Sequence, residues 1–155
     1  DILGKAGLPA YEVSNHAMSP EHQSGHNLIY WQGGDWIGAG PGAHGRVTVG
    51  GHRYAYEAHR RPEVYTANVQ ALGSGWGDAE RLEPNAIAQE LLAMGLRPAS
   101  GIDIARIEAV SGRPVSREKI AVFVDQGWVT FDQGVLSLTP SGRLLADALT
   151  AQLAS

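Results

Sequence analysis

Apolar positions in the second half of the chain recur with the period of an α-helix. Over residues 84–96 they form a single stripe of Ile87, Leu91, Leu92 and Met94. A stripe of this width is typical of the buried face of an amphipathic helix. A second helix is predicted over residues 102–110, with inner positions Ile102, Ala105, Ile107 and Val110.

A third helix is predicted after Ser116, which is a favourable N-cap residue, and it would end at Gly127. Its candidate inner residues are Ile120, Val122, Phe123 and Val124. Two short strands follow over residues 128–131 and 135–138, joined by the three-residue loop Asp132-Gln133-Gly134. Pro140 is well placed to begin a closing helix that runs to about residue 153. This order of elements predicts a small winged-helix-like domain.

The first half of the chain has shorter and less periodic segments. Gly7 is expected to end a helix over residues 2–7, and Ser24 to cap a short helix that reaches residue 31. A hairpin of residues 46–49 and 52–56 would turn at Gly50-Gly51. The remaining expected elements are strands over residues 8–13 and 36–39 and a helix over residues 62–72. Together the two halves predict an α+β fold.

A domain boundary is expected near residues 73–77, Gly-Ser-Gly-Trp-Gly, because this composition is typical of a linker. The predicted domains are residues 1–77 and 78–155. The sequence begins at Asp1 rather than Met and has no signal-peptide pattern there. We therefore expect the chain to be a segment of a longer protein.

Composition narrows the function classes. Of 155 residues, 43% are hydrophobic and 18% are charged, which is typical of a folded chain rather than a disordered one. The formal net charge of −4 provides no basic surface for nucleic acid. The chain has no cysteine, which excludes a disulfide, a thiolate nucleophile and a cysteine-ligated zinc ion or iron–sulfur cluster within it. No apolar run approaches the length of a membrane span.

The stretch Gly38-Ala39-Gly40-Pro41-Gly42-Ala43-His44-Gly45-Arg46 is the strongest candidate for a ligand loop. Glycine lets the backbone approach a ligand closely, although a plain glycine-rich turn explains the same composition. Residues 40–45 match the G-x-G-x-x-G spacing of dinucleotide-binding proteins, but a β-branched strand follows where that site requires a helix. No lysine with serine or threonine follows the glycines, so a P-loop is excluded as well.

Two other kinds of site carry less weight. His16, His22 and His26 have a spacing that Pro20 and Gly25 prevent from lying on one helix, and no known metal-binding pattern is completed nearby. Contacts to a ligand, or exposed histidines, are the alternatives. A winged helix can bind DNA, but residues 81–155 carry seven basic and eight acidic side chains. A structural domain is therefore the favoured interpretation of this region.

Three motifs, in order, resemble one protein family. They are Tyr11-Glu12-Val13-Ser14-Asn15, then His26-Asn27-x-x-Tyr30-Trp31, then Asp35-x-x-Gly38-x-Gly40-Pro41-Gly42-Ala43-His44-Gly45-Arg46. Together they resemble the C-terminal part of the oxygen-independent coproporphyrinogen III oxidase-like radical-SAM proteins, and most closely the heme chaperone branch. Glu90-Leu91-Leu92-x-x-Gly95-Leu96-Arg97 and Gly101-Ile102-Asp103 extend this resemblance over nearly the whole chain.

The resemblance implies a partial (β/α) barrel that ends in residues 1–77, followed by the winged-helix-like domain. It implies that the longer, cytoplasmic protein uses S-adenosylmethionine and a 4Fe-4S cluster held by three cysteines. Because this chain has none of those cysteines, it should be inactive alone. The chaperone branch is implied to bind heme and deliver it to acceptor proteins.

Site roles follow from the resemblance and from side-chain chemistry. Backbone amides of the loop with Gly38, Gly40, Gly42 and Ala43 would approach S-adenosylmethionine or a tetrapyrrole. His44 would contact a porphyrin, and Arg46 would pair with a propionate. The aromatic residues Tyr11, Tyr30 and Trp31 would pack on a flat ring, although core packing explains them equally. Polar contacts would come from Ser14, Asn15, His26 and Asn27.

Three functions remain open at this point. They are a heme chaperone, an oxygen-independent coproporphyrinogen III oxidase and a winged-helix nucleic-acid module. A terminal barrel strand without its neighbours would leave an open edge, so oligomerisation of the isolated segment is also considered.

Overall fold

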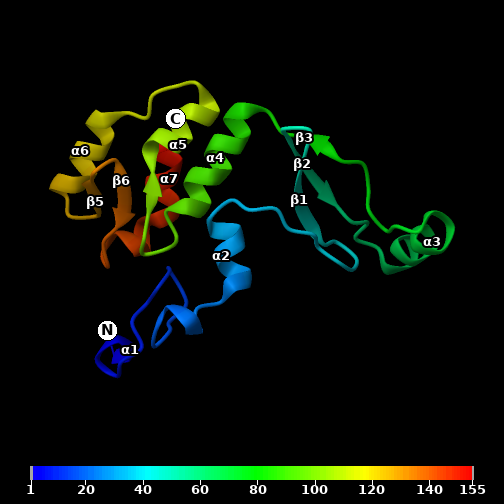
Figure 1. Cartoon of the computed structure of the whole chain (residues 1–155), viewed down its shortest axis with the longest axis horizontal. Coiled ribbons are helices and arrows are strands. Elements are labelled where there is room, and N and C mark those ends of the chain that lie inside the picture. Colours follow the sequence, from blue (N-terminus) through cyan, green and yellow to red (C-terminus); the bar gives the residue numbers. More distant parts are fainter. Residues whose placement is uncertain (1, 155) are drawn as a thin grey trace. The chain divides into compact units, whose positions relative to one another are not determined.

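The computed structural model describes residues 2–154, which form two compact units (Figure 1). One unit, here called the helical unit, combines residues 2–33 with residues 84–154. The other, here called the hairpin unit, comprises residues 34–83. The predicted α+β class is confirmed, because each unit contains helices and an open three-stranded sheet. The domain boundary predicted near residues 73–77, with domains 1–77 and 78–155, stays a prediction.

The core of the helical unit lies among four helices and one small sheet. The helices are α4 (Pro84–Gly95), α5 (Ile104–Ser111), α6 (Arg117–Asp125) and α7 (Ala146–Ala154). Leu92, Leu96, Ile104, Leu136 and Leu149 are all at most 2% exposed. A side chain of this kind contributes about 1.5–3 kcal/mol when it is fully buried, so this cluster dominates the stability of the unit.

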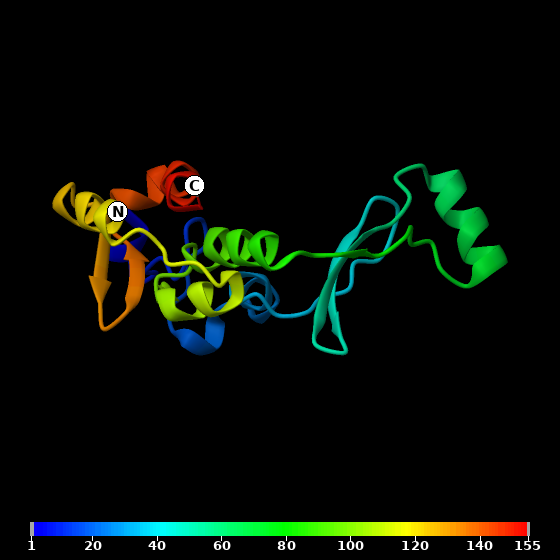
Figure 2. The same cartoon turned by 90° about the horizontal axis from the view of Figure 1, so that it is seen from above.

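The sheet of the helical unit has the order β4-β6-β5, with antiparallel pairing throughout. Its strands are β4 (Ile102–Asp103), β5 (Val129–Asp132) and β6 (Val135–Leu138). The predicted hairpin is confirmed, and it lies below α6 in Figure 2. The predicted three-residue loop is wrong, because Asp132 pairs with Val135 and leaves Gln133 and Gly134 as a two-residue turn with φ of 48° and 86°.

Three further details of this unit differ from the prediction. The second helix begins at Ile104 rather than Ile102, because Ile102 and Asp103 pair with β6 and the Asp103 carboxylate caps the helix. In α6, Val122 and Val124 are 54% and 40% exposed, while Ile120 and Phe123 are buried. The closing helix is preceded by a 3₁₀ turn, η2 (Gly142–Leu145), which packs its first glycine against the carbonyl of Trp128.

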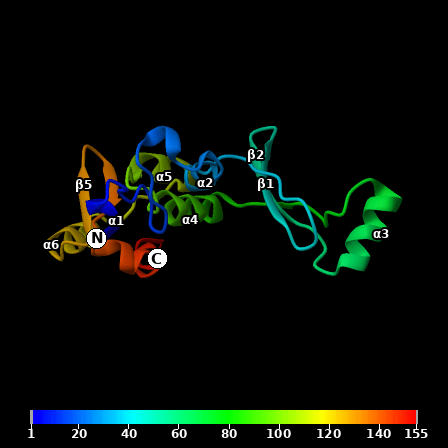
Figure 3. The same ribbon diagram turned by 90° about the horizontal axis from the view of Figure 1, so that it is seen from below.

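The N-terminal segment packs on the helical core without forming the predicted strand. Its elements are α1 (Ile2–Lys5), η1 (Pro20–His22) and α2 (Gly25–Trp31), and α2 lies beside α4 (Figure 3). The strand predicted over residues 8–13 is wrong. Only isolated bridges occur there, from Ala10 to His16 and from Glu12 to Pro98, because no neighbouring strand among the described residues pairs with the segment continuously.

The hairpin unit is built on β1 (His44–Val49) and β2 (His52–Glu57), with β3 (Glu80–Arg81) paired to the far side of β2. Gly50 and Gly51 have φ of 58° and 78°, as the predicted turn requires. The segment 36–39 forms a single bridge, Trp36 to Arg46, rather than the predicted strand. Helix α3 (Pro62–Leu72) has the predicted bounds, and extended segments join it to the hairpin (Figure 2).

Candidate functional site

Two tyrosines hold the glycine loop of the hairpin unit. The Gly38 amide donates to the Tyr56 hydroxyl at 3.1 Å, and the Gly40 amide donates to the Tyr65 hydroxyl at 3.2 Å. The Gly42 amide donates to the His59 carbonyl, and the Ala43 amide donates to the Gly40 carbonyl. A ligand that bound these four amides would have to replace these bonds. Their predicted contact with a ligand stays a prediction.

Close packing explains two of the glycines without a ligand. A Cβ atom on Gly45 would lie 1.9 Å from Cζ of Tyr56, and one on Gly38 would lie 2.3 Å from the His44 carbonyl oxygen. Gly40 and Gly42 have φ of 106° and 71°, a backbone conformation that favours glycine. The predicted strand after the glycines is confirmed, since β1 begins at His44 and no helix opens at Gly45.

Arg46 belongs to a stacked arrangement around Trp36. The guanidinium carbons of Arg46 and Arg53 lie 5.4 Å and 5.7 Å from the centre of the Trp36 ring. Arg46 also donates to the Gly45 carbonyl at 2.9 Å. Arg53, which is 8% exposed, forms an ion pair with Asp35 at 3.3 Å. Asp35 in turn accepts hydrogen bonds from the amide and hydroxyl of Thr48, so it ties the segment before the glycine loop to β1.

His44 and Arg46 border a cavity of about 220 Å³ within the hairpin unit. Three carboxylates, of Glu57, Asp78 and Glu80, also line it. The hydrogen bond from Arg60 is the main cause that lowers the pKa of Glu57; desolvation opposes it, and the nearby Arg60 charge adds to the lowering. An anionic group bound in this cavity would be attracted by the Arg46 guanidinium and repelled by the three carboxylates. We therefore expect such a group to bind next to Arg46.

The Tyr11–Asn15 motif forms a tight reversal in the helical unit. The Tyr11 amide donates to the Asn15 carbonyl at 3.2 Å, and Ser14 and Asn15 are exposed at the tip. Glu12 is 0% exposed, and its Oε1 accepts both the amide and the hydroxyl of Ser14 at 3.0 Å. Its Oε2 has no hydrogen-bond partner among the described residues. Buried carboxylates are rare, so Glu12 is a residue of this motif that sequence reasoning overlooked.

The start of α2 gathers several predicted site residues. The Ser24 hydroxyl caps the helix by accepting from the Asn27 amide at 3.3 Å, as predicted. The Ser24 amide donates to the Tyr11 hydroxyl at 3.1 Å, which joins the Tyr11–Asn15 motif to α2. His26, the second residue of α2, and Tyr30, one turn later, have Nε2 and hydroxyl oxygen 2.8 Å apart, with their rings edge to face. Tyr11, His26, Asn27 and Tyr30 therefore share one region of the helical unit.

Trp31 serves the packing of the helical unit. Its ring lies 5.1 Å from the Arg97 guanidinium carbon, and Arg97 forms an ion pair with Asp147 at 3.1 Å. The indole Nε1 is buried without a hydrogen-bond partner among the described residues. These contacts agree with the alternative that Trp31 is a packing residue, and its contact with a flat ring stays a prediction.

The three N-terminal histidines have separate partners. His16 Nδ1 lies 2.8 Å from the Leu8 carbonyl, and His22 Nδ1 lies 2.6 Å from the Ser19 hydroxyl. Within residues 2–154, no group of three histidine, cysteine, aspartate or glutamate side chains is arranged to hold a metal ion. The predicted site residues thus fall into two sets, one in each unit, and their roles stay predictions.

The fold and motifs correspond to one class, the C-terminal part of coproporphyrinogen-oxidase-like radical-SAM proteins. Residues 82–145 match the family model described as the HemN C-terminal domain. The structure also resembles coproporphyrinogen III oxidase (HemN) from Escherichia coli, with a TM-score of 0.58 over 99% of this chain and 33% of that one. At 14% identity this likeness concerns the fold alone.

The sequence relatives are more specific. Over 97% of its length the chain is 35% identical to heme chaperone HemW of Mycobacterium tuberculosis, of which it covers 36%. Over 65% of its length it is 41% identical to the mouse protein named radical S-adenosyl methionine domain-containing protein 1, mitochondrial, of which it covers 24%. These matches confirm the resemblance to this radical-SAM family and its heme chaperone branch. The chain spans about a third of the length of the relatives that it matches over nearly its whole sequence.

Proposed function

We propose that this chain is the C-terminal part of a heme chaperone that binds heme as cargo and passes it to acceptor proteins. The observation that carries the proposal is the similarity along 97% of the chain to a relative named heme chaperone HemW. The structure supports it by bringing Tyr11, His26 and Tyr30 of the two N-terminal motifs into one region.

The residues present do not suit the iron–sulfur cluster that the family implies. A 4Fe-4S cluster needs cysteine thiolates, and the chain has none. Cluster binding is therefore assigned to other parts of the longer protein, whereas contact of the glycine loop with S-adenosylmethionine stays a prediction. The cytoplasmic location that the resemblance implies stays part of this proposal. No helix among the described residues is long and apolar enough to cross a membrane.

Heme is the group that the predicted residues of this chain would contact. Arg46 would pair with a propionate through its guanidinium, whose planar fork suits a carboxylate. His44 lies exposed beside it at the start of β1 and offers an imidazole to the same ligand. In the helical unit, the exposed polar tip of Ser14 and Asn15 would add neutral contacts.

The second candidate is an oxygen-independent coproporphyrinogen III oxidase, supported by the fold of the Escherichia coli enzyme. Its substrate also carries propionates, so binding alone does not separate the two functions. A turnover assay does. Reconstituted protein of full natural length that forms no protoporphyrinogen but binds hemin agrees with the chaperone. Robust conversion would favour the oxidase.

A nucleic-acid function gains no support from the winged-helix-like region. Both basic side chains of α6 make contacts within the unit: Arg117 pairs with Glu108, and Lys119 donates to the Gln152 carbonyl. Because both groups are already engaged, α6 offers no free basic face of the kind that DNA recognition requires.

The heme proposal is tested by titrating hemin into the full-length protein and its variants. Loss of a charge-assisted pair costs about 1.5–3 kcal/mol, so Arg46→Gln is expected to weaken hemin binding about tenfold or more. Arg61→Gln is the matched control, because Arg61 is an exposed arginine of the same unit that does not line the cavity. Equal affinity of both variants and the unmodified protein would remove Arg46 from the site.

A further inference from the structure

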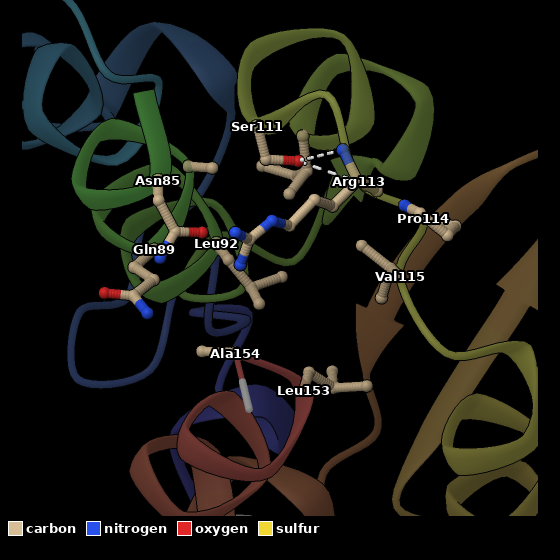
Figure 4. Close-up of a pocket in the computed structure, with 11 residues that line it drawn as sticks. Asn85, Gln89, Leu92, Ser111, Arg113, Pro114, Val115, Leu153 and Ala154 are labelled. Carbon is tan, nitrogen blue, oxygen red and sulfur yellow. Dashed lines mark hydrogen bonds between the residues drawn. The ribbon is translucent and has the colours of Figure 1, made fainter. Parts of the chain in front are cut away.

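A second cavity, of about 120 Å³, lies wholly within the helical unit (Figure 4). It opens between α4, the end of α5, the end of α7 and the loop of residues 112–115. One water molecule needs roughly 10–15 Å³ of such space, so the cavity has room for an organic group of several atoms. None of the predicted heme-site residues lines it.

The floor of this cavity is apolar and well ordered by packing. Leu92, Ile107, Val115 and Leu153 line it, and each is at most 8% exposed. These side chains belong to the main core of the unit. An aliphatic group that entered the cavity would therefore contact a preformed hydrocarbon surface, which favours its transfer from water.

The rim carries one charged side chain among the described residues that line the cavity, Arg113. Figure 4 shows this side chain extended from the loop toward α4, on the side of Asn85. The structure records no ion pair or hydrogen bond for its guanidinium within residues 2–154. Among the described residues that line its cavity none carries a carboxylate, in contrast to the cavity beside Arg46.

The backbone of Arg113 is held in place by a local clamp. The Ser111 hydroxyl accepts from the Arg113 amide and donates to the Arg113 carbonyl, both at 3.1 Å. Two residues on, the Val115 amide donates to Glu108 at 2.8 Å. The Arg113 guanidinium therefore extends from a loop whose backbone is already held by hydrogen bonds. Ligand binding would require little further ordering of this backbone.

We propose that this pocket binds the carboxylate end of a short aliphatic group. The guanidinium of Arg113 would take the carboxylate at the rim, and the hydrocarbon part would occupy the floor against Leu92 and Leu153. Two sources offer this chemistry, a free short-chain acid and the C-terminal carboxylate of a peptide that ends in an aliphatic residue. The pocket is independent of the heme proposal.

The test is an NMR titration of the 15N-labelled chain with valerate, using 1-pentanol and pentylamine as matched neutral and cationic probes. Valerate is expected to give saturable shifts at residues around the cavity, with weaker effects from pentanol and none from pentylamine. Arg113→Gln should weaken valerate binding about tenfold, the usual effect of losing a charge-assisted hydrogen bond.

Arg106→Gln is the matched control, because Arg106 is an exposed arginine on α5 that does not line the cavity. It should leave the valerate affinity within about twofold, since exposed charges act weakly at a distance. Ala154→Leu, which places a larger side chain at the cavity edge, should weaken binding while retaining the Arg113 charge. Circular dichroism of each variant checks that the helices are kept.

A second arm compares a tripeptide ending in leucine with its C-terminal amide. Tighter binding of the free-acid peptide than of valerate identifies a peptide terminus as the source, and the reverse identifies a free acid. The proposal is overturned if neither carboxylate gives saturable shifts at the cavity, or if the Arg113→Gln and unmodified chains bind valerate equally. Heme binding measured separately would remain unaffected by either result.

Discussion

At the scale of residues, the glycine loop depends on the aromatic side chains that surround it. The Tyr56 hydroxyl accepts from Gly38, and the Tyr56 ring packs against Gly45 and stacks on Trp76 with ring centres 3.9 Å apart. Tyr65 holds Gly40 in the same manner and packs against Gly75. The loop is therefore shaped by this chain's own side chains before any ligand binds.

Gly45→Ala should destabilise the hairpin unit by about 1–3 kcal/mol, the usual effect of forcing extra volume into a packed site. Its new methyl group would overlap the Tyr56 ring, which cannot move without losing its stack on Trp76. Urea unfolding followed by tryptophan fluorescence measures the change. Gly25→Ala, where a Cβ atom would meet nothing within 4 Å, is the control and should leave stability nearly unchanged.

At the scale of elements, one carboxylate joins α5 to α6. Glu108 accepts the Val115 amide and pairs with Arg117 at 3.0 Å, while Ser116 caps α6. The hydrogen bond from the Val115 amide, followed by that from Arg117, lowers the pKa of Glu108. This contact braces the same loop that presents Arg113.

The pH dependence of this contact has a defined sign. Because the folded state lowers the Glu108 pKa, the contact stabilises the fold above the ordinary glutamate pKa of about 4.3 and is lost as pH falls through the lower folded value. Urea unfolding should therefore show Glu108→Gln less stable than the unmodified chain at pH 7. The two should converge below about pH 4. A constant difference across this range would contradict the assignment.

At the scale of the whole molecule, the two units have unequal cores. The main buried cluster of the helical unit contains sixteen residues, from Ala88 to Leu153. In the hairpin unit, the buried hydrophobic side chains recorded are Tyr56 and Ala58. Helix α3 buries none of its residues, and Leu72 is 75% exposed. The hairpin unit is thus stabilised more by hydrogen bonds and stacking than by hydrophobic burial.

Amide hydrogen exchange should show the difference in hydrophobic burial between the two units, because each unit contains a similar β-hairpin. Both the β1–β2 and β5–β6 hairpins are antiparallel with two-residue turns, but only the second places strand residues such as Val129 and Leu136 in the main cluster. Local opening is easier where few apolar contacts are lost. Amides of β1 and β2 should exchange faster than those of β5 and β6. Equal protection would show that burial does not set their stability.

Much of the fold was predictable because it depends on neighbours in sequence. Ser24 and Ser116 cap the helices as expected, and Gly7, Gly50 and Gly127 have the positive φ that their turns require. The motifs likewise identified the radical-SAM family, since their residue types and spacing are local properties of the chain.

What depends on distant parts of the chain was not predictable in the same way. The composition of residues 8–13 predicts a strand, but a strand forms only when a neighbouring strand pairs with it along its length. In this segment Glu12 forms only an isolated bridge to Pro98. Val122 and Val124 fit a helical pattern yet remain exposed, because packing decides which face of α6 is covered. Glu12 was overlooked because burial of a carboxylate follows from the surrounding fold.

The sequence by itself determined the existence of the main helices, the Ser24 and Ser116 caps, the Gly50-Gly51 turn and the family, because these depend on residues close together in the chain. Only the tertiary structure decided that two tyrosines hold the glycine loop, that the motif residues divide between two units, and that Arg113 lies at the rim of a cavity with an apolar floor. Those arrangements depend on contacts across many residues, which residue spacing alone does not specify.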